Sequence, residues 1–288
     1  MLGNLIGVLF DGVAYGSLLF LISVGLSVTM GLMKFVNLAH GAFAMVGGYV
    51  CVLTMMNLGT PFLLALPLAF VAAAVMGVVL ERTLYRRLYR ASHLDQVLFS
   101  IGLTFMAVAA ASYFFGPTQQ PVQLPEWLRG QWSFLGIDIG IYRLFLIAVV
   151  LVVTAGLGYL LERTRFGARV RAAVDNQNVS AAVGINVDRV FTLTFALGSG
   201  LAGLGAGLGI EVLGLDPTFP FKYLVYFLLV VAVGGAGTIK GPLVAALVLG
   251  VFDVAGKYYV PDIGAFVIYV LMVVLLILFP AGLYGRRA

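Results

Sequence analysis

Long apolar runs separated by short polar stretches make up most of this chain. The apolar residues in these runs are continuous rather than alternating, so each run predicts a helix and not a strand. Several runs reach about 18 residues, the length that a helix needs to cross a bilayer. The pattern predicts an all-α integral membrane protein, one transmembrane domain over 1–288 with about eight or nine membrane helices. The runs lie at roughly 5–30, 41–57, 61–80, 96–115, 140–161, 190–213, 222–236, 242–259 and 263–280.

Two polar interruptions inside this pattern predict broken or re-entrant helices. The first, near 31–41, holds Asn37 and His40, and the second, near 234–242, is rich in glycine and holds Lys240. Broken helices leave backbone N–H and C=O groups free, and at membrane depth such groups need surrounding protein or a water-filled cavity. Each interruption precedes two apolar runs and a basic end, which hints at two related halves.

Composition and charge support a membrane protein and give it an orientation. The chain is 62% hydrophobic and only 10% charged, too few charges to cover a soluble domain of this length. Its net charge of +5 arises from arginines that predict cytoplasmic segments at 81–95, 162–189 and the C-terminus. Counting crossings back from 81–95 then puts the N-terminus outside. These arginines are Arg82, Arg86, Arg87, Arg90, Arg163, Arg165, Arg169, Arg171, Arg189, Arg286 and Arg287.

The residues that carry enzyme chemistry are scarce. The only histidines, His40 and His93, are distant and lack a carboxylate cluster, and the single Cys51 excludes an internal disulfide. The lysine in 234–242 is followed by glycine instead of Ser or Thr, so a Walker A motif fails. No strand precedes the Gly-x-G-x-x-Gly match at 198–203, so a dinucleotide site fails too. We expect no catalytic residue, metal or cofactor here. The first residues lack a basic region and a cleavage site, so we expect no cleaved signal peptide.

Several polar or small residues inside the apolar runs have two interpretations. Asn37 and His40 either line a substrate path or mark a helix break that Asn37 caps. Asp11 and Asp253 are candidates for the interior of the helix bundle. Small residues recur every four positions in the 190–213 run and predict close helix packing, within this chain or against a partner subunit. These packing residues are Gly198, Ala202, Gly203 and Gly207.

The polar stretch at about 162–189 is too rich in arginine to lie in lipid and must face water. It predicts short helices over 168–174 and 179–183, with Asn176 between them and Gly184 ending the second. Such amphipathic helices either lie on a lipid surface or dock into the groove of a soluble partner. Composition alone leaves both interpretations open.

Six short motifs follow one another along nearly the full length of the chain. They are Asn-Leu-Ala-His-Gly at 37–41, Glu-Arg-Thr-Leu-Tyr-Arg at 81–86, Ser-Ile-Gly-Leu at 100–103, the pair at 167–172 and 184–189, Gly-Gly-Ala-Gly-Thr at 234–238 with Gly-Pro at 241–242, and Pro-Ala-Gly-Leu at 280–283. In this order the motifs resemble the permease subunits of ATP-binding-cassette (ABC) importers for branched-chain amino acids. The resemblance is to the first of the two related membrane subunits.

The resemblance implies a multi-pass permease of the bacterial inner membrane, with a periplasmic N-terminus and a cytoplasmic C-terminus. The implied partners are a second homologous permease, two cytoplasmic ATPases that use ATP and Mg²⁺, and a periplasmic substrate-binding protein. The stretch at 162–189 becomes a coupling loop, which favours ATPase docking over lipid adhesion. The expected coupling residues are Arg169, Arg171, Ala182, Gly184, Ile185 and Asn186, and the expected path residues are Asn37, His40 and Tyr226.

Departures from the family pattern keep the substrate open. The family often has a basic residue where this chain has Tyr226, and Lys222 stands one turn earlier. We expect branched-chain or related hydrophobic amino acids as substrates, and the changed basic residue leaves urea, short amides and aromatic or other carboxylates as alternatives. A self-sufficient secondary transporter or channel would need a paired intramembrane charge site for ion coupling, and the scarcity of such charges argues against it. A membrane-embedded enzyme would need an acid–base or metal constellation.

Overall fold

Helices dominate the computed structural model, which describes residues 2–33, 35, 37–89, 91–122, 124–134 and 137–284. Arg90, Arg286 and Arg287, used in the orientation argument, lie outside the described residues. The helices are α1 (Leu2–Met33), α2 (His40–Leu58), α3 (Phe62–Leu80), the π-helical turn η1 (Glu81–Tyr85), α4 (Arg86–Leu88), α5 (His93–Phe115), the short turn η2 (Glu126–Leu128), α6 (Ile141–Arg163), α7 (Arg165–Asp175), α8 (Gln177–Ala182), α9 (Val187–Leu213), α10 (Phe219–Gly234), α11 (Lys240–Tyr259) and α12 (Gly264–Leu278). Two short strands, β1 (Gln131–Phe134) and β2 (Ile137–Gly140), pair as an antiparallel hairpin.

Within the described residues, seven helical segments are long and apolar enough to cross a membrane. They are α1, α2, α3 with its continuation through η1 and α4, α5, α6, α9 and α11. Helices α10 and α12 are apolar but shorter. The predicted all-α membrane fold, with about eight or nine apolar helices, is confirmed.

Helix α9 lies at the centre of the bundle and packs against α1, α2 and α3. At Gly198, its backbone lies close to Gly25 of α1. At Gly203, it lies close to Gly47 of α2 and Ala73 of α3. Small residues allow such approaches because no side chain separates the two backbones. The four-residue pattern of small side chains therefore serves contacts inside this chain.

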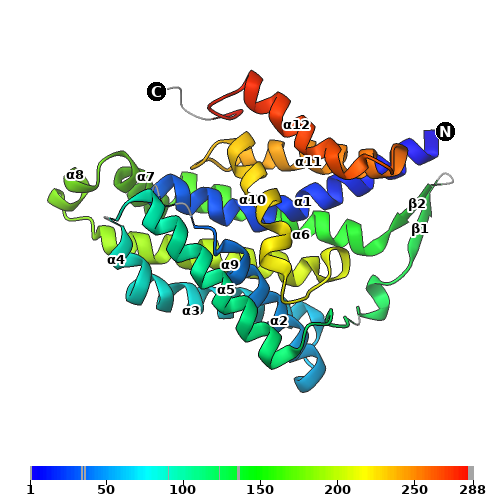
Figure 1. Ribbon diagram of the computed structural model, residues 1–288, viewed down its shortest axis with the longest axis horizontal. Helices are drawn as coiled ribbons and strands as arrows, with labels where there is room; N and C mark the ends of the chain where they lie inside the picture. The colour runs from blue at the N-terminus through cyan, green and yellow to red at the C-terminus, as the bar shows by residue number, and fades with distance from the viewer. Residues whose placement is uncertain are drawn as a thin grey trace.

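Helix α10 crosses the bundle instead of running along it. In Figure 1, α1 and α11 follow the long axis of the molecule, whereas α10 runs across that axis. Pro220 at its start contacts Gly41 of α2, and Gly237 just after its end contacts Gly31 near the end of α1. The apolar run at 222–236 therefore predicts the helix but not its tilt, because tilt is set by packing against neighbours.

Both predicted breaks are present, and both lie against α1. Helix α2 begins at His40, whose Nε2 lies 2.7 Å from the carbonyl oxygen of Ile22, about three turns before α1 ends. At the second break, the N–H of Gly237 donates to the carbonyl of Ser27 at 2.9 Å. The Ser27 hydroxyl donates to the carbonyl of Thr238 at 3.0 Å. Hydrogen bonds to protein groups thus satisfy the backbone atoms that the break leaves without a helical partner, as a break inside a membrane requires.

Candidate functional site

The polar stretch predicted to face water lies at one end of the molecule, where Figure 1 shows α7 and α8. Three capping side chains, Thr164, Asn176 and Asn186, begin α7, α8 and α9. Each side-chain oxygen accepts from the backbone N–H three residues later, at 3.3, 3.0 and 2.9 Å respectively. These caps satisfy backbone donors that a helix start leaves free. Local side chains therefore divide the stretch into separate short helices.

Gly184 ends α8 as the sequence predicts. Its φ of +88° lies in the left-handed region, where a side chain is strained. Its N–H donates to the carbonyl of Ala181, and the N–H of Ile185 donates to the carbonyl of Ser180, both at 3.0 Å. This paired arrangement is a Schellman motif, which satisfies the last carbonyls of a helix and turns the chain sharply.

Helix α7 buries its apolar face within this chain. Val170 and Ala173 pack with Val190 and Phe191 at the start of α9. Gly167 lies directly against the backbone of Leu161 at the end of α6, where a Cβ would not fit. Most of its apolar face is thus covered, and Val174, 37% exposed, is the large apolar side chain of α7 that remains open.

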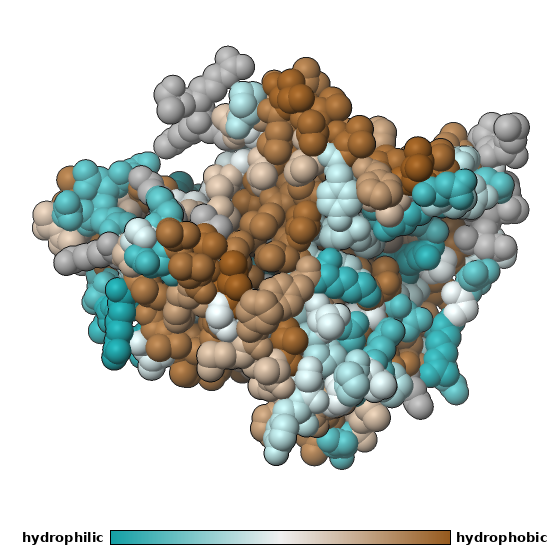
Figure 2. Space-filling view, in the orientation of Figure 1, coloured by the Kyte–Doolittle hydropathy of each residue, from teal (hydrophilic) through white to brown (hydrophobic). Residues whose placement is uncertain are grey.

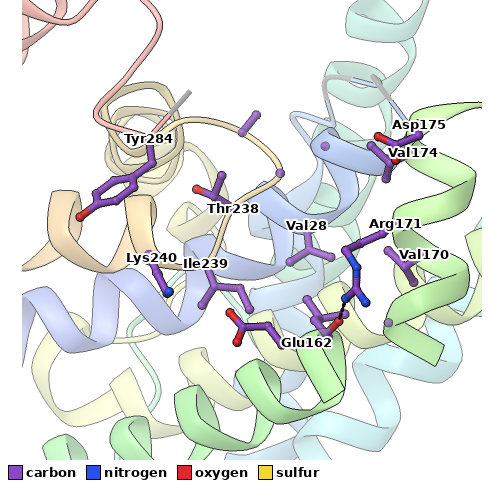
Figure 3. A pocket seen from close by; sticks show the side chains of 15 residues that line it. Val28, Glu162, Val170, Arg171, Val174, Asp175, Thr238, Ile239, Lys240 and Tyr284 are labelled. Atoms are coloured by element: carbon purple, nitrogen blue, oxygen red, sulfur yellow. Dashed lines mark hydrogen bonds between the residues drawn. The ribbon is translucent and has the colours of Figure 1, made fainter. Parts of the chain in front are cut away.

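Helix α8, in contrast, presents apolar side chains at the tip of the molecule. Val179 is 57% exposed and Val183 is 71% exposed, and both belong to the loop between α6 and α9. Arg171 points back into the protein, since its guanidinium donates to the carbonyl of Leu161 (Figure 3). Of the other expected coupling residues, Arg169, Ala182, Gly184 and Asn186 are exposed and Ile185 is half-buried.

A cavity of about 510 Å³ joins this end of the molecule to the second helix break. Figure 3 shows Glu162 and Arg171 on one side and Lys240 and Tyr284 on the other. The segment after α10 and the segment after α12 therefore lie beside α7. The polar loop at 162–189 and the glycine-rich break share one open space.

A buried carboxylate connects the start of α9 to the elbow that follows α3. Glu81 in η1 is 1% exposed and accepts a hydrogen bond from the hydroxyl of Tyr89 and another from Thr192 of α9, both at 2.7 Å. Burial, together with the hydrogen bond to Glu81, raises the pKa of Tyr89, so its hydroxyl stays a donor. Arg86 adds an ion pair to Asp188 on the same two elements.

The same elbow reaches the first helix break. The fully buried Tyr85 donates to Oδ1 of Asn37 at 2.8 Å, and this oxygen also accepts from the N–H of Ala39 at 3.1 Å. Around it, the ring of Tyr85 contacts Phe35 and Phe195, with centroids 5.3 and 4.8 Å away. A continuous set of contacts thus runs from the start of α9, through η1, to the start of α2.

The expected path residues do not lie together. Asn37 and His40 are 3% and 2% exposed, and both hold the start of α2 through backbone contacts. Tyr226 lies elsewhere, half-buried on α10 with its ring 6.4 Å from that of Tyr269 on α12. Asp253 is buried as predicted, while Asp11 is partly exposed and paired with Arg143 of α6.

Sequence reasoning missed Glu81, Tyr85 and Thr192 as contact residues, although two of them stand in a quoted motif. A glutamate inside an arginine-rich segment at the end of an apolar run was the available signal. Among the described residues, no three His, Cys, Asp or Glu side chains come close enough to hold a metal ion.

A multi-pass bundle with interrupted helices and a folded polar loop at one end defines a membrane transport protein. The chain belongs to the family described as branched-chain amino acid transport system / permease component, whose model matches residues 8–276. It is similar to the high-affinity branched-chain amino acid transport system permease protein LivH of Salmonella typhimurium, with 27% identity over 96% of this chain and 94% of the relative.

Two further relatives show similar agreement. BraD of Pseudomonas aeruginosa, also a high-affinity branched-chain amino acid transport system permease protein, is 28% identical over 96% of this chain and 95% of its own length. A probable branched-chain amino acid transport permease protein LivH of Methanocaldococcus jannaschii is 26% identical over 96% and 92%. No solved structure matches the chain significantly. The chain is thus a permease subunit, with a transport role and not an enzymatic one.

Proposed function

We propose that this chain imports branched-chain or related hydrophobic amino acids as one permease of an ATP-driven, binding-protein-dependent importer. The family match over residues 8–276 supports this proposal most directly. ATP and Mg²⁺ belong to two cytoplasmic ATPase subunits, and a second homologous permease completes the path. A periplasmic protein delivers the substrate. The membrane is the bacterial inner membrane.

The end of the molecule that carries α7 and α8 is the cytoplasmic end and receives the ATPase. The largely covered apolar face of α7 and the exposed Val179 and Val183 of α8 support docking over lipid adhesion. A short helix that presents apolar side chains beyond the membrane fits a groove on a soluble partner. Arg169, Ala182, Gly184, Ile185 and Asn186 complete the docking surface, and Arg171 holds α7 against α6.

Coupling follows from the contacts around Glu81. When ATP binding moves the ATPases, the docked α8 and the neighbouring α7 move with them. This movement reaches α9, because α7 is packed on the start of α9. That movement reaches η1 through Thr192 and Glu81, and it reaches the start of α2 through Tyr85 and Asn37. The chain needs no catalytic residue for this role, since the ATPases supply the free energy.

A Val183→Asp substitution tests the docking surface in the complete importer. A charge buried at a docking contact without a partner costs several kcal/mol. We expect leucine uptake into proteoliposomes to fall at least about tenfold. We also expect the ATPases to be lost from the complex during purification in mild detergent, with normal amounts of this chain in the membrane.

Val260→Asp is the matched control. Val260 is also exposed, at 46%, but it follows the last residue of α11, far from α8. We expect this variant to keep both ATPase binding and uptake. Full uptake by Val183→Asp would contradict the docking role. Purification without any ATPase or second permease, even after cross-linking, would instead favour a self-sufficient transporter.

A further inference from the structure

Four tyrosines gather where the crosswise helix α10 meets α1 and α12. Tyr223 and Tyr226 of α10 have ring centroids 6.1 Å apart, and Tyr226 lies 6.4 Å from Tyr269 of α12. Tyr15 lies on α1, which also packs against α10, and the Nζ of Lys257 on α11 lies 5.7 Å from the centroid of its ring. A hydroxyl group at membrane depth needs polar surroundings, so this cluster marks a polar site and not a lipid-facing surface.

A buried ion pair on α11 completes this cluster. Asp253 is 1% exposed, and its Oδ2 accepts a hydrogen bond from the ammonium of Lys257 at 2.6 Å. The other oxygen, Oδ1, has no hydrogen-bond partner within the described part of the chain. Lys257 is half-exposed, and its Nζ lies 5.7 Å from the ring centroid of Tyr15. A buried carboxylate oxygen without a donor is costly, so a donor from outside the chain would stabilise it.

The cluster lies on the side of the bundle remote from α7 and α8. Tyr15 stands between Gly12 and Gly16, where α1 packs against α11, about five turns before α1 ends at the coupling end. In Figure 2, teal and pale residues gather on the half of the molecule opposite α7 and α8, beside a brown apolar area. A substrate that enters from the end opposite the coupling loop would meet this polar area first.

We propose that Asp253, Lys257, Tyr15 and Tyr226 bind the zwitterionic head group of an amino acid during its passage. The α-ammonium of the substrate donates to Oδ1 of Asp253 and lies against the tyrosine rings, which attract cations. The α-carboxylate accepts from Lys257, whose half-exposed side chain can reach both groups. This inference rests on the proposed import of amino acids.

The charges of the site select for a zwitterion. The site holds one carboxylate and one ammonium side by side, so its net charge is zero. A substrate with both charges leaves every charge paired. An amine or an acid of the same shape leaves one protein charge without a counterpart, which is strongly unfavourable away from water.

Competition binding tests this selectivity in the complete importer, with both permeases and the ATPases, in lipid nanodiscs without the binding protein. Radiolabelled L-leucine is displaced by leucinamide, which lacks the carboxylate, and by 4-methylpentanoate, which lacks the ammonium. We expect the native site to prefer leucine over both. Asp253→Asn should weaken leucine about tenfold or more, because leucine loses a charge-assisted hydrogen bond, and should strengthen 4-methylpentanoate, because the acid no longer leaves Asp253 without a counter-charge.

Lys257→Gln should show the mirror result, with leucine weakened about tenfold or more and leucinamide strengthened, because the amine no longer competes with the Lys257 ammonium for Asp253. Asp11→Asn is the matched control, because Asp11 forms its ion pair with Arg143 of α6 and not with Asp253 or Lys257, and it should keep the native preferences. If one of the two variants, Asp253→Asn or Lys257→Gln, fails to assemble, the other alone tests whether the site selects zwitterions.

Equal weakening of all three ligands, or native preferences in both variants, would overturn the site and leave Asp253 and Lys257 as a structural ion pair. Lack of leucine binding to the native importer up to about 10 mM would overturn it as well. Uptake with the binding protein present separates the two proposals. If the native importer takes up leucine but the competition experiments show no such selectivity, only the proposed site is wrong. If the native importer takes up no branched-chain amino acid, the proposed function is wrong.

Discussion

Glu81 illustrates how a charged residue is accommodated at the edge of the membrane. Both of its carboxylate oxygens have a hydroxyl donor, from Tyr89 and Thr192, so the cost of its burial is offset. The ion pair between Arg86 and Asp188 links the same elements, but both side chains are well exposed, and such pairs contribute about 0–1 kcal/mol. The hydrogen bonds of Glu81 therefore hold η1 to α9.

A Thr192→Val substitution should reveal this contribution. Valine keeps the shape of threonine but leaves Oε2 of Glu81 without its donor, which costs about 1–3 kcal/mol when the group is buried. We expect a lower thermal unfolding temperature in detergent and weaker coupling of ATP hydrolysis to uptake. Thr83→Val is the control, because the Thr83 hydroxyl is exposed and bonds only within its own helix, to the carbonyl of Val79. An unchanged unfolding temperature for Thr192→Val would contradict the role of Glu81.

At this scale, prediction from sequence depended on the distance along the chain between interacting residues. Asn176 and Gly184 could be assigned to helix ends because capping acts over about three residues. The contact of Tyr85 with Asn37 spans 48 residues, and that of Thr192 with Glu81 spans 111. No local pattern in a single sequence encodes such pairs, so the route from the coupling loop to the first break required the structure.

Among the elements, α8 depends on the conformation of one residue after its end. Gly184 has a φ of +88° and open space where a Cβ would lie. Gly184→Ala should therefore cost about 1–2 kcal/mol through backbone strain alone, and it should misdirect Ile185 and Asn186.

We expect Gly184→Ala to lower the stimulation of ATP hydrolysis by substrate-loaded binding protein several-fold in the reconstituted importer. Gly184→Asn should retain most of it, because asparagine tolerates this conformation. Equal losses in both variants would point to a clash of the added side chain with the ATPase, and not to the turn.

Helix α10 shows the limit of an apolar run as a predictor. Its composition is that of a spanning segment, yet Pro220 contacts Gly41 and the helix crosses the bundle. Apolarity sets whether a helix can lie in the membrane, while its neighbours set its direction. On this crosswise helix, Phe227 packs against His40 with ring centroids 6.4 Å apart, while Tyr226 packs against Tyr269 of α12.

For the whole molecule, the fold separates two ends that should face opposite sides of the membrane. Asn178 of α8 is exposed at one end, and Asp262, between α11 and α12, is exposed at the other. With Cys51 replaced by alanine, single cysteines at these positions report orientation through a membrane-impermeant maleimide. We expect Asn178→Cys to react only in inside-out vesicles and Asp262→Cys only in spheroplasts. The reverse pattern would contradict the cytoplasmic assignment of the coupling loop.

The extensive contact between α1 and α11 has a consequence for biosynthesis. Helix α1 is synthesised well before the helix against which it packs most extensively, α11, which ends at Tyr259. At about 5–20 residues per second, α1 waits on the order of ten to forty seconds in the membrane before that partner arrives. During this interval its glycine-lined surface, including Gly12 and Gly16, has no native neighbour from α11. Chains that stall before α11 would expose this surface to quality-control proteases, so correct insertion of α11 is the step at which the growing permease becomes protected.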